Sequence, residues 1–257
     1  MPRAIWTGAI TFGLVHVPVR LVTAVQDTNP SFNLIDPESG GRVHYKTVNE
    51  DGDEVERSDL VKGYEVESGE YVTVEPEELD ELAPEKTDAI EIENFVEIAE
   101  IDPIFYDKPY YLLPDERAKK PYKLLLAAME KAGKIGIAKF VMHQREHLTA
   151  VRPLHGMLCL VLMRFAEEIR PTEELGLQLD EVEVDDDELD VAIQLIDAMT
   201  EEFHPEDFTN EYEQRVRELL QAKAEGEEFV VPERAEEEVE TESLVDALKK
   251  SLEKAQK

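Results

Sequence analysis

The chain has 257 residues and a formal net charge of -33, from 60 acidic and 27 basic side chains. A hydrophobic content of 42% is enough for a core, so the chain is not a wholly disordered acidic polymer. A single cysteine excludes an internal disulfide and an all-cysteine zinc site, and no apolar run is long enough for a membrane span. The first twenty residues do not resemble a signal peptide, and we expect a cytoplasmic protein.

The charge is distributed unevenly along the chain. Residues 51–100 carry a net charge of -16 and residues 165–257 carry -22, whereas residues 101–164 carry +5. Salt limits the reach of each charge to about 10 Å. A chain of this composition can therefore still present a positive surface, although its net charge argues weakly against nucleic acid as a partner.

The first half of the chain predicts mainly strands. Apolar runs punctuated by Gly8, Gly13 and Pro18 indicate strands within residues 3–25. Residues 42–48 alternate basic or polar residues with β-formers and predict another strand. The remaining predictions are a hairpin at 61–66 and 71–74, a short helix at 76–82 and a strand at 89–96.

The second half changes from strands to helices. Helical spacing of apolar residues predicts a helix at about 118–132, which Gly133 ends. Strands are predicted within 135–143 and 148–165, followed by two helices marked by apolar residues at 189–199 and 208–220. Residues 225–242 are predicted to form an acidic linker, and Ser243 to cap a last short helix. The fold class is therefore mainly β with α, an α+β protein.

The most catalytic-looking string is His143-Gln-Arg-Glu-His147, an H-x-x-E-H pattern known from some zinc peptidases. That chemistry needs a helix, whereas the flanking residues predict strands. We therefore expect the string at a hairpin tip, with the two histidines diverging and no metal bound. Cys159 lies between two leucines and is predicted to be a buried strand residue.

Basic residues form the second candidate set. Arg42 and Lys46 flank Tyr45, and further cations follow at Arg57, Lys62, Lys119, Lys120, Lys123, Arg145 and Arg152. Phosphate contacts need positive charge at irregular spacing, so spacing carries little information here.

Several separate segments, in order, resemble the prokaryotic Ku proteins. The resemblance covers about residues 2–224 and the short tail. Its motifs are MPRAIWTGAITFGLVHVPV at the start, Gly41–Lys46, Lys62–Glu65, Ile101–Pro114, Tyr212 and the helix at 243–254.

The resemblance implies a β-barrel core with a bridge insertion over residues 1–170 and a helical dimerisation arm over 171–224. An acidic linker at 225–242 and a ligase-recruiting helix at 243–257 would follow. Two copies would form a ring around a double-stranded DNA end, independent of sequence, in non-homologous end joining. The family implies no catalytic activity and no cofactor, and it implies recruitment of a multifunctional ATP-dependent DNA ligase. We expect a nucleoid-associated protein that needs no membrane.

The resemblance implies that Arg42, Lys46, Arg57 and Lys62 lie in the bridge, on the inner wall of the ring. We expect DNA contacts from these four and from Arg20, Lys119, Lys120 and Arg145, and ligase contacts from Leu244, Leu248, Leu252 and Lys249. Two features depart from the family: residues 47–55 lack the cysteines that some relatives carry there, and a long lysine-rich tail is missing.

Two rival interpretations remain open. The first is an acidic interaction scaffold or DNA mimic that has kept the fold and lost DNA binding; the charge of -33 favours it. The second is a zinc hydrolase built on His143 and His147.

Overall fold

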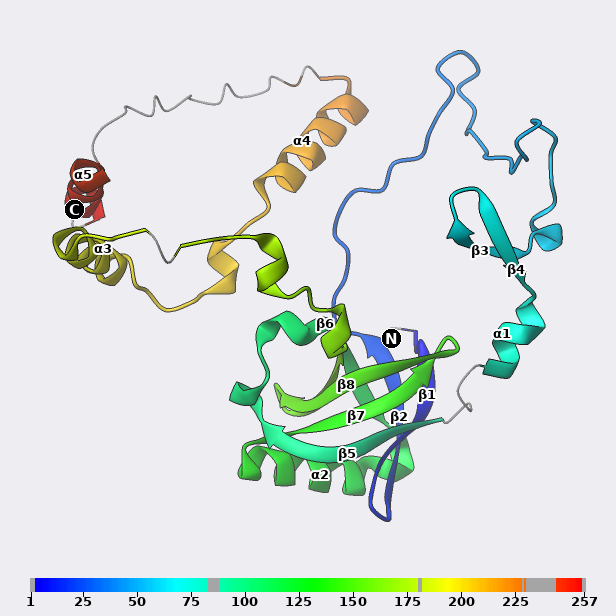
Figure 1. Cartoon of the computed structure of the whole chain (residues 1–257), viewed down its shortest axis with the longest axis horizontal. Helices are drawn as coiled ribbons and strands as arrows, with labels where there is room; N and C mark the ends of the chain where they lie inside the picture. Colours follow the sequence, from blue (N-terminus) through cyan, green and yellow to red (C-terminus); the bar gives the residue numbers. More distant parts are fainter. Residues whose placement is uncertain (1–2, 83–87, 180–181, 228, 230–243, 256–257) are drawn as a thin grey trace. The chain divides into compact units, whose positions relative to one another are not determined.

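The computed structural model describes residues 3–82, 88–179, 182–227, 229 and 244–255, which fall into two units (Figure 1). The first unit comprises Met1–Asp27 and Asn33–Pro171, and the second comprises Thr28–Phe32 and Thr172–Lys257.

A closed barrel forms the body of the first unit. Its strand order is β1-β2-β6-β9-β8-β7-β5. Neighbouring strands are antiparallel except β1 and β5, which pair in parallel and close the barrel. The strands are β1 (Trp6–Phe12), β2 (Val15–Thr23), β5 (Ala89–Glu97), β6 (Tyr106–Pro114), β7 (Lys134–Met142), β8 (Arg145–Leu154) and β9 (Met157–Met163). The predicted β-rich segments at 3–25, 89–96, 135–143 and 148–165 are thus confirmed.

The barrel interior is the hydrophobic core. Alternating side chains of the strands point inward, and Phe140, Ile10 and Leu21 are among the largest that are fully buried. Cys159 on β9 is buried as predicted, and burial raises the pKa of its thiol.

Helix α2 (Lys119–Ala132) closes one end of the barrel (Figure 1). The predicted apolar stripe is confirmed: Tyr122, Leu125, Leu126 and Met129 are buried in the barrel core. Gly133 ends the helix in the left-handed conformation, with φ of 64°. The chain enters β7 directly after α2, so the end of the barrel at Lys134 is the capped end.

A long inserted segment leaves the barrel at its other end. It begins after Thr23 of β2 and returns at Ala89 of β5. It contains η1 (Arg57–Asp59), β3 (Lys62–Glu67), β4 (Glu70–Val74) and α1 (Pro76–Leu82), so the predicted hairpin and short helix are confirmed. The predicted strand at 42–48 is wrong: only isolated bridges form there, Ile35 with Arg42 and Val48 with Glu54.

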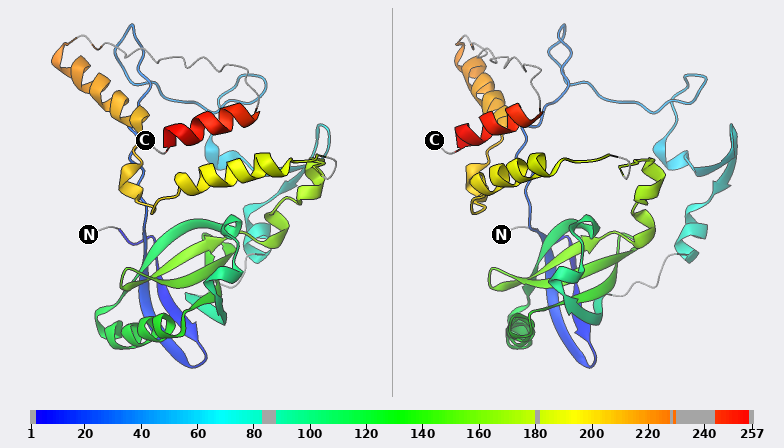
Figure 2. Two further views of the ribbon diagram at one scale, coloured as in Figure 1. Left: turned by 90° about the vertical axis from the view of Figure 1, so that its left-hand side faces the viewer. Right: turned by 60° about the vertical axis from the view of Figure 1, so that its left-hand side comes forward.

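The second unit is helical. It contains α3 (Asp186–Ala198), α4 (Glu211–Glu225) and α5 (Leu244–Ala255), and α5 packs against α3 (Figure 2). The three predicted helices are confirmed, although Phe208 lies before α4 rather than within it. Most of the predicted acidic linker, and the Ser243 cap, lie outside the described residues. Within the described part of the chain, no helix is both long and apolar enough to cross a membrane.

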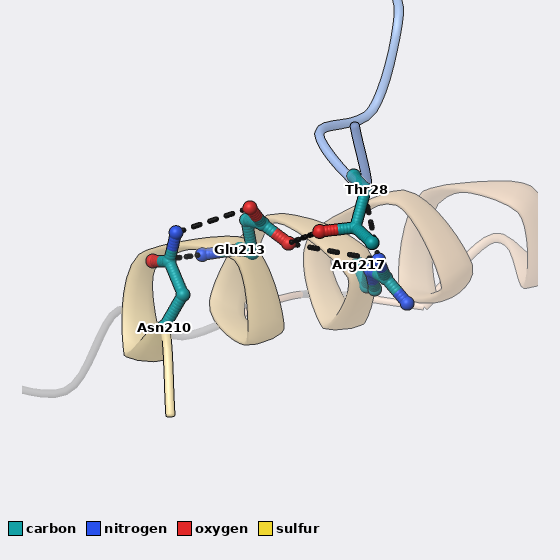
Figure 3. A network of polar contacts seen from close by, with 4 residues as sticks. All are labelled: Thr28, Asn210, Glu213 and Arg217. Atoms are coloured by element: carbon teal, nitrogen blue, oxygen red, sulfur yellow. Dashed lines mark hydrogen bonds and ion pairs between the residues drawn. The ribbon is translucent and has the colours of Figure 1, made fainter. Parts of the chain in front are cut away.

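Helix α4 holds the start of the inserted segment (Figure 3). Glu213 accepts a hydrogen bond of 3.0 Å from the Thr28 hydroxyl, and Arg217 donates one of 2.9 Å to the Thr28 carbonyl. Glu213 and Arg217 also form an ion pair at 3.6 Å. Asn210 caps the helix by accepting from the Glu213 amide. These contacts fix residue 28 on the helical unit, and they join positions 185 or more residues apart in sequence.

Candidate nucleic-acid interface

The inserted segment has no hydrophobic core of its own. None of residues 23–82 is buried. Large apolar side chains are exposed along it, including Tyr45 at 86%, Tyr64 at 70% and Phe32 at 69%. Local hydrogen bonds hold its turns, and its large apolar side chains are exposed to solvent.

Arg42 lies in a small hairpin whose turn is formed by Asp36. The Val43 amide donates to the Leu34 carbonyl, and the Asp36 amide donates to Gly41. The Asp36 carboxylate accepts from the Ser39 hydroxyl and from the amides of Glu38 and Ser39. These hydrogen bonds lower the pKa of the Asp36 carboxyl, and the bond from the Ser39 hydroxyl has the largest effect. The hydrogen bonds near Arg42 therefore belong to this small hairpin and its turn, and not to a larger β-sheet.

Lys46 precedes a second turn and is paired within it. Its ammonium donates to Glu54 at 2.6 Å, and both side chains are largely exposed. The Asn49 side chain accepts from the amides of Asp51 and Asp53, at 3.1 and 2.9 Å. Asn49 thereby holds this turn. The turn lies within residues 47–55, where this chain lacks the cysteines that some members of the family it resembles carry.

Two further cations of the inserted segment follow in exposed positions. Arg57 opens η1, and Lys62 opens β3 opposite Val74. All four predicted cations of this segment are therefore solvent-accessible, but acidic residues alternate with them along the chain.

Arg145 lies at the barrel end from which the inserted segment emerges. It is the first residue of β8 and pairs in register with Met142. Arg145 and Lys108 line a hollow of about 620 Å³. The third cation of the hollow is Arg164. Its guanidinium donates to the carbonyls of Ile104 and Tyr106 and forms an ion pair with Asp107. Asp107, Glu146 and Glu168 also line it, so the local charge is mixed.

The H-x-x-E-H string adjoins the same hollow. Only His143 and Gln144 form the turn, with φ of 52° and 63°, and β8 begins at Arg145. His143 and His147 both line the hollow. The His147 ring lies 5.8 Å from the Phe140 ring. Within the described residues, no group of three or more His, Cys, Asp or Glu side chains is arranged to hold a metal.

The remaining predicted DNA contacts lie elsewhere on the barrel. Lys119 and Lys120 begin α2 at the capped end, opposite Arg145 along the barrel. Lys119 donates to Glu116 at 2.7 Å, which lowers the pKa of Glu116. Arg20 lies midway along β2 and is 3.9 Å from Asp115. The structure therefore does not bring these three cations together with Arg145.

The predicted ligase-contacting helix is present as α5. Leu248 and Leu252 are half-buried and Lys249 is exposed. Leu244 begins the helix. The facing side of α3 presents half-buried Val191, Ala192 and Leu195.

Comparisons with known proteins match this architecture to one family. The family model described as the Ku70/Ku80 beta-barrel domain matches residues 11–191. A protein of Saccharopolyspora erythraea named non-homologous end joining protein Ku 1 is 42% identical, over 100% of this chain and 80% of that protein. The corresponding protein of Archaeoglobus fulgidus is 39% identical, over 98% of each. The chain belongs to the Ku family.

Among solved structures, the SPOC domain of human PHD-finger protein 3 aligns with a TM-score of 0.33 and 13% identity. The alignment covers 63% of this Ku-family chain and 97% of that domain. A score this low supports no argument about fold or function.

Sequence reasoning missed two features of this Ku-family chain. Lys108 shares a hollow with Arg145, and the only available signal was its place within the matching segment 101–114. The contacts of Thr28 with Glu213 and Arg217 had no sequence signal, because residues so far apart carry no shared periodicity.

Proposed function

We propose that this chain binds double-stranded DNA ends as a ring-shaped homodimer in non-homologous end joining. It acts without catalysis or cofactor, within the cytoplasm at the nucleoid. Membership of the Ku family supports the pathway. The observation that carries the assembly is the inserted segment, which bears exposed cations and apolar side chains and buries none of its described residues.

The proposed partner of the inserted segment is a second copy of the chain. A single barrel with one insertion does not enclose a duplex. The second unit likewise exposes large apolar side chains, including Phe203 at 77%, Phe208 and Tyr212 at 75%. A segment with so much exposed apolar surface is typical of an interface rather than of a free monomer surface.

The proposed DNA contacts are the cations of the inserted segment, Arg42, Lys46, Arg57 and Lys62, together with Arg145 and Lys108 at the adjoining barrel end. They contact phosphates and need no base readout, which agrees with binding to ends of any sequence. Lys46 already pairs with Glu54, so a phosphate competes with this carboxylate for the Lys46 ammonium group. The positions of Arg20, Lys119 and Lys120 give less support to their predicted role.

A charge-reversal experiment tests this interface. Arg42→Glu with Lys46→Glu should weaken binding to a short linear duplex strongly. It should also flatten the dependence of log affinity on log salt by about 0.9 for each phosphate that the variant no longer neutralises. The matched control is Lys119→Glu with Lys120→Glu, which reverses two charges at the opposite barrel end and should change both quantities much less.

Fluorescence anisotropy across a salt series measures both quantities, and circular dichroism checks that both variants are folded. Equal effects in the two variants, or no effect in the first, would show that the inserted segment is not the interface.

The proposed role of α5 is recruitment of an ATP-dependent DNA ligase. Lys249 of α5 is exposed, Leu248 and Leu252 are half-buried, and α5 packs against α3. A ligase that binds the leucine stripe must therefore displace α5 from α3. Truncation after Glu242 should abolish ligase stimulation while leaving DNA binding intact. Full stimulation by the truncated protein would place the recruiting surface elsewhere.

An acidic scaffold or DNA mimic is the second candidate. The net charge of -33 and the internal pairing of Lys46 favour it. It predicts no binding to linear duplex at any salt concentration, so the same titration separates the two functions.

A further inference from the structure

An apolar groove lies at the capped end of the barrel. It has a volume of about 600 Å³ and lies between the β1–β2 turn, β5 and α2. Its lining includes Phe12, Val15, Phe95, Leu124 and Ala128, and among the described residues Lys134 is the one charged side chain that lines it. Phe12 and Phe95 meet edge to face at 6.4 Å. Aromatic and aliphatic side chains therefore form a preformed hollow of the size that binding sites have.

The apolar side chains of this groove are open to solvent. Leu124 is 71% exposed, Phe95 is 43% exposed and Val15 is 39% exposed. Leu14, at the tip of the adjoining turn, is fully exposed. Apolar surface of this extent on a folded barrel marks an interaction site rather than ordinary surface variation.

The rim of the groove is cationic, although the chain is strongly acidic. Lys120 lies four residues before Leu124 and Lys131 three residues after Ala128, so both flank the groove on α2. Lys134 is at the rim on β7 and is paired with Glu97 at 2.8 Å. Glu130 lies six residues from Leu124 and therefore on another side of the helix. The local excess of positive charge favours an acidic ligand, because long-range repulsion from the rest of the chain is screened by salt.

The position of the groove argues for a peptide rather than DNA. The inserted segment leaves from the opposite end of the barrel, so the groove lies away from the proposed DNA contacts. The lysines of α2 lie only at its edge, whereas its described lining is apolar and its one charged side chain, Lys134, is already paired. A ligand that fills the groove therefore needs apolar side chains, which a phosphate backbone lacks. We propose that this groove is a docking site for an acidic peptide that carries two or three apolar anchor side chains. The proposal does not rest on DNA binding.

Peptide binding to the full-length protein tests this proposal. The probe is a fluorescein-labelled amphipathic peptide of about 16 residues, long enough for a few helical turns, with leucines on one face and glutamates on the other. Two comparison peptides replace the glutamates by lysines or the leucines by serines. We expect the acidic leucine peptide to bind, the lysine version to bind about tenfold more weakly, and the serine version not to bind measurably.

Two pairs of variants locate the binding. Ala128→Glu lies in the groove and should weaken the acidic peptide about tenfold or more, whereas Ala127→Glu, an exposed neighbour outside the lining, should not. Lys131→Glu should weaken it about threefold, and Lys119→Glu should have no effect. Ala127→Glu, Ala128→Glu and Lys131→Glu should bind linear DNA like the unmodified protein if they are folded, which separates this proposal from the function proposed above.

Four outcomes would overturn the proposal. Equal binding of the acidic and basic peptides would show that charge does not select the ligand. Equal effects of Ala127→Glu and Ala128→Glu would show that the peptide does not bind in the groove. Failure of the acidic peptide to bind, with a lowered oligomeric state of Ala128→Glu in sedimentation, would make the groove an interface between copies of this chain. Competition of duplex DNA with the peptide would assign the surface to DNA.

Discussion

At Gly8 the backbone of β1 passes so close to its neighbours that no side chain fits. An added Cβ would collide with the Trp6 ring and with the carbonyl oxygen of Asp88. That same oxygen accepts a hydrogen bond of 2.9 Å from the Ala9 amide. The crowding therefore lies at the parallel junction of β1 and β5 that closes the barrel.

We predict that Gly8→Ala lowers the free energy of unfolding by about 1–3 kcal/mol, because the junction must open to admit the methyl group. The control is Gly41→Ala, whose added Cβ would meet the Ser39 hydroxyl at 3.4 Å and nothing else nearby. It should change stability by less than about 0.5 kcal/mol. Urea unfolding followed by circular dichroism measures both values, and similar destabilisation of the two variants would contradict this explanation of Gly8.

Individual site residues were only partly predictable from the sequence. Arg42, Lys46 and Arg145 are exposed where the resemblance led us to expect cations. The ion pair of Lys46 with Glu54 was not predictable, because the turn that joins them depends on Asn49 and its hydrogen bonds to Asp51 and Asp53. The histidines of the H-x-x-E-H string likewise share a hollow that no local pattern indicates.

At the scale of elements, Tyr122 fastens α2 to the barrel. Its hydroxyl donates to the Leu112 carbonyl and accepts from the Leu158 amide, each at 2.7 Å, and the ring is buried. One side chain thus joins the capping helix to β6 and β9. Burial, the larger cause, raises the pKa of this phenol, which therefore remains neutral at physiological pH.

Tyr122→Phe should lower the free energy of unfolding by about 1–3 kcal/mol, because it leaves the buried Leu158 amide without this acceptor. Tyr45→Phe is the matched control, since Tyr45 is 86% exposed and its change should be negligible. Thermal unfolding by calorimetry compares the variants. If Tyr122→Phe were as stable as Tyr45→Phe, the two hydrogen bonds would contribute nothing to holding the helix.

Elements with a strong local signal were predicted well. Helix α2 has an apolar stripe at helical spacing and a terminal glycine, and the β3–β4 hairpin has its Ser68-Gly69 turn. Residues 42–48 have β-forming composition but form no strand. A strand requires a partner, and within the described part of the chain only the single bridges to Ile35 and Glu54 are formed there. The composition of residues 42–48 indicates a propensity for strand structure, but it does not indicate whether a neighbouring strand is available to pair with them.

At the scale of the whole molecule, large apolar side chains are exposed both on the inserted segment and on the helical unit. Neither surface follows from periodicity, because these side chains resemble core residues in the sequence. The barrel strands were predictable because they bury alternating residues against each other, whereas their closure into a barrel was expected only from the resemblance. The proposed assembly depends instead on a second molecule covering the exposed surfaces, and its sequence signal is likewise the resemblance.

A ring around DNA can be loaded only at an end. Titrating the full-length protein with linear duplex and with covalently closed circular duplex of the same sequence therefore tests the proposed ring. A ring should bind the linear form alone, and should stay on it once both ends are blocked by bulky groups after loading. Equal binding to the closed circle, or rapid dissociation from the blocked linear form, would contradict the ring.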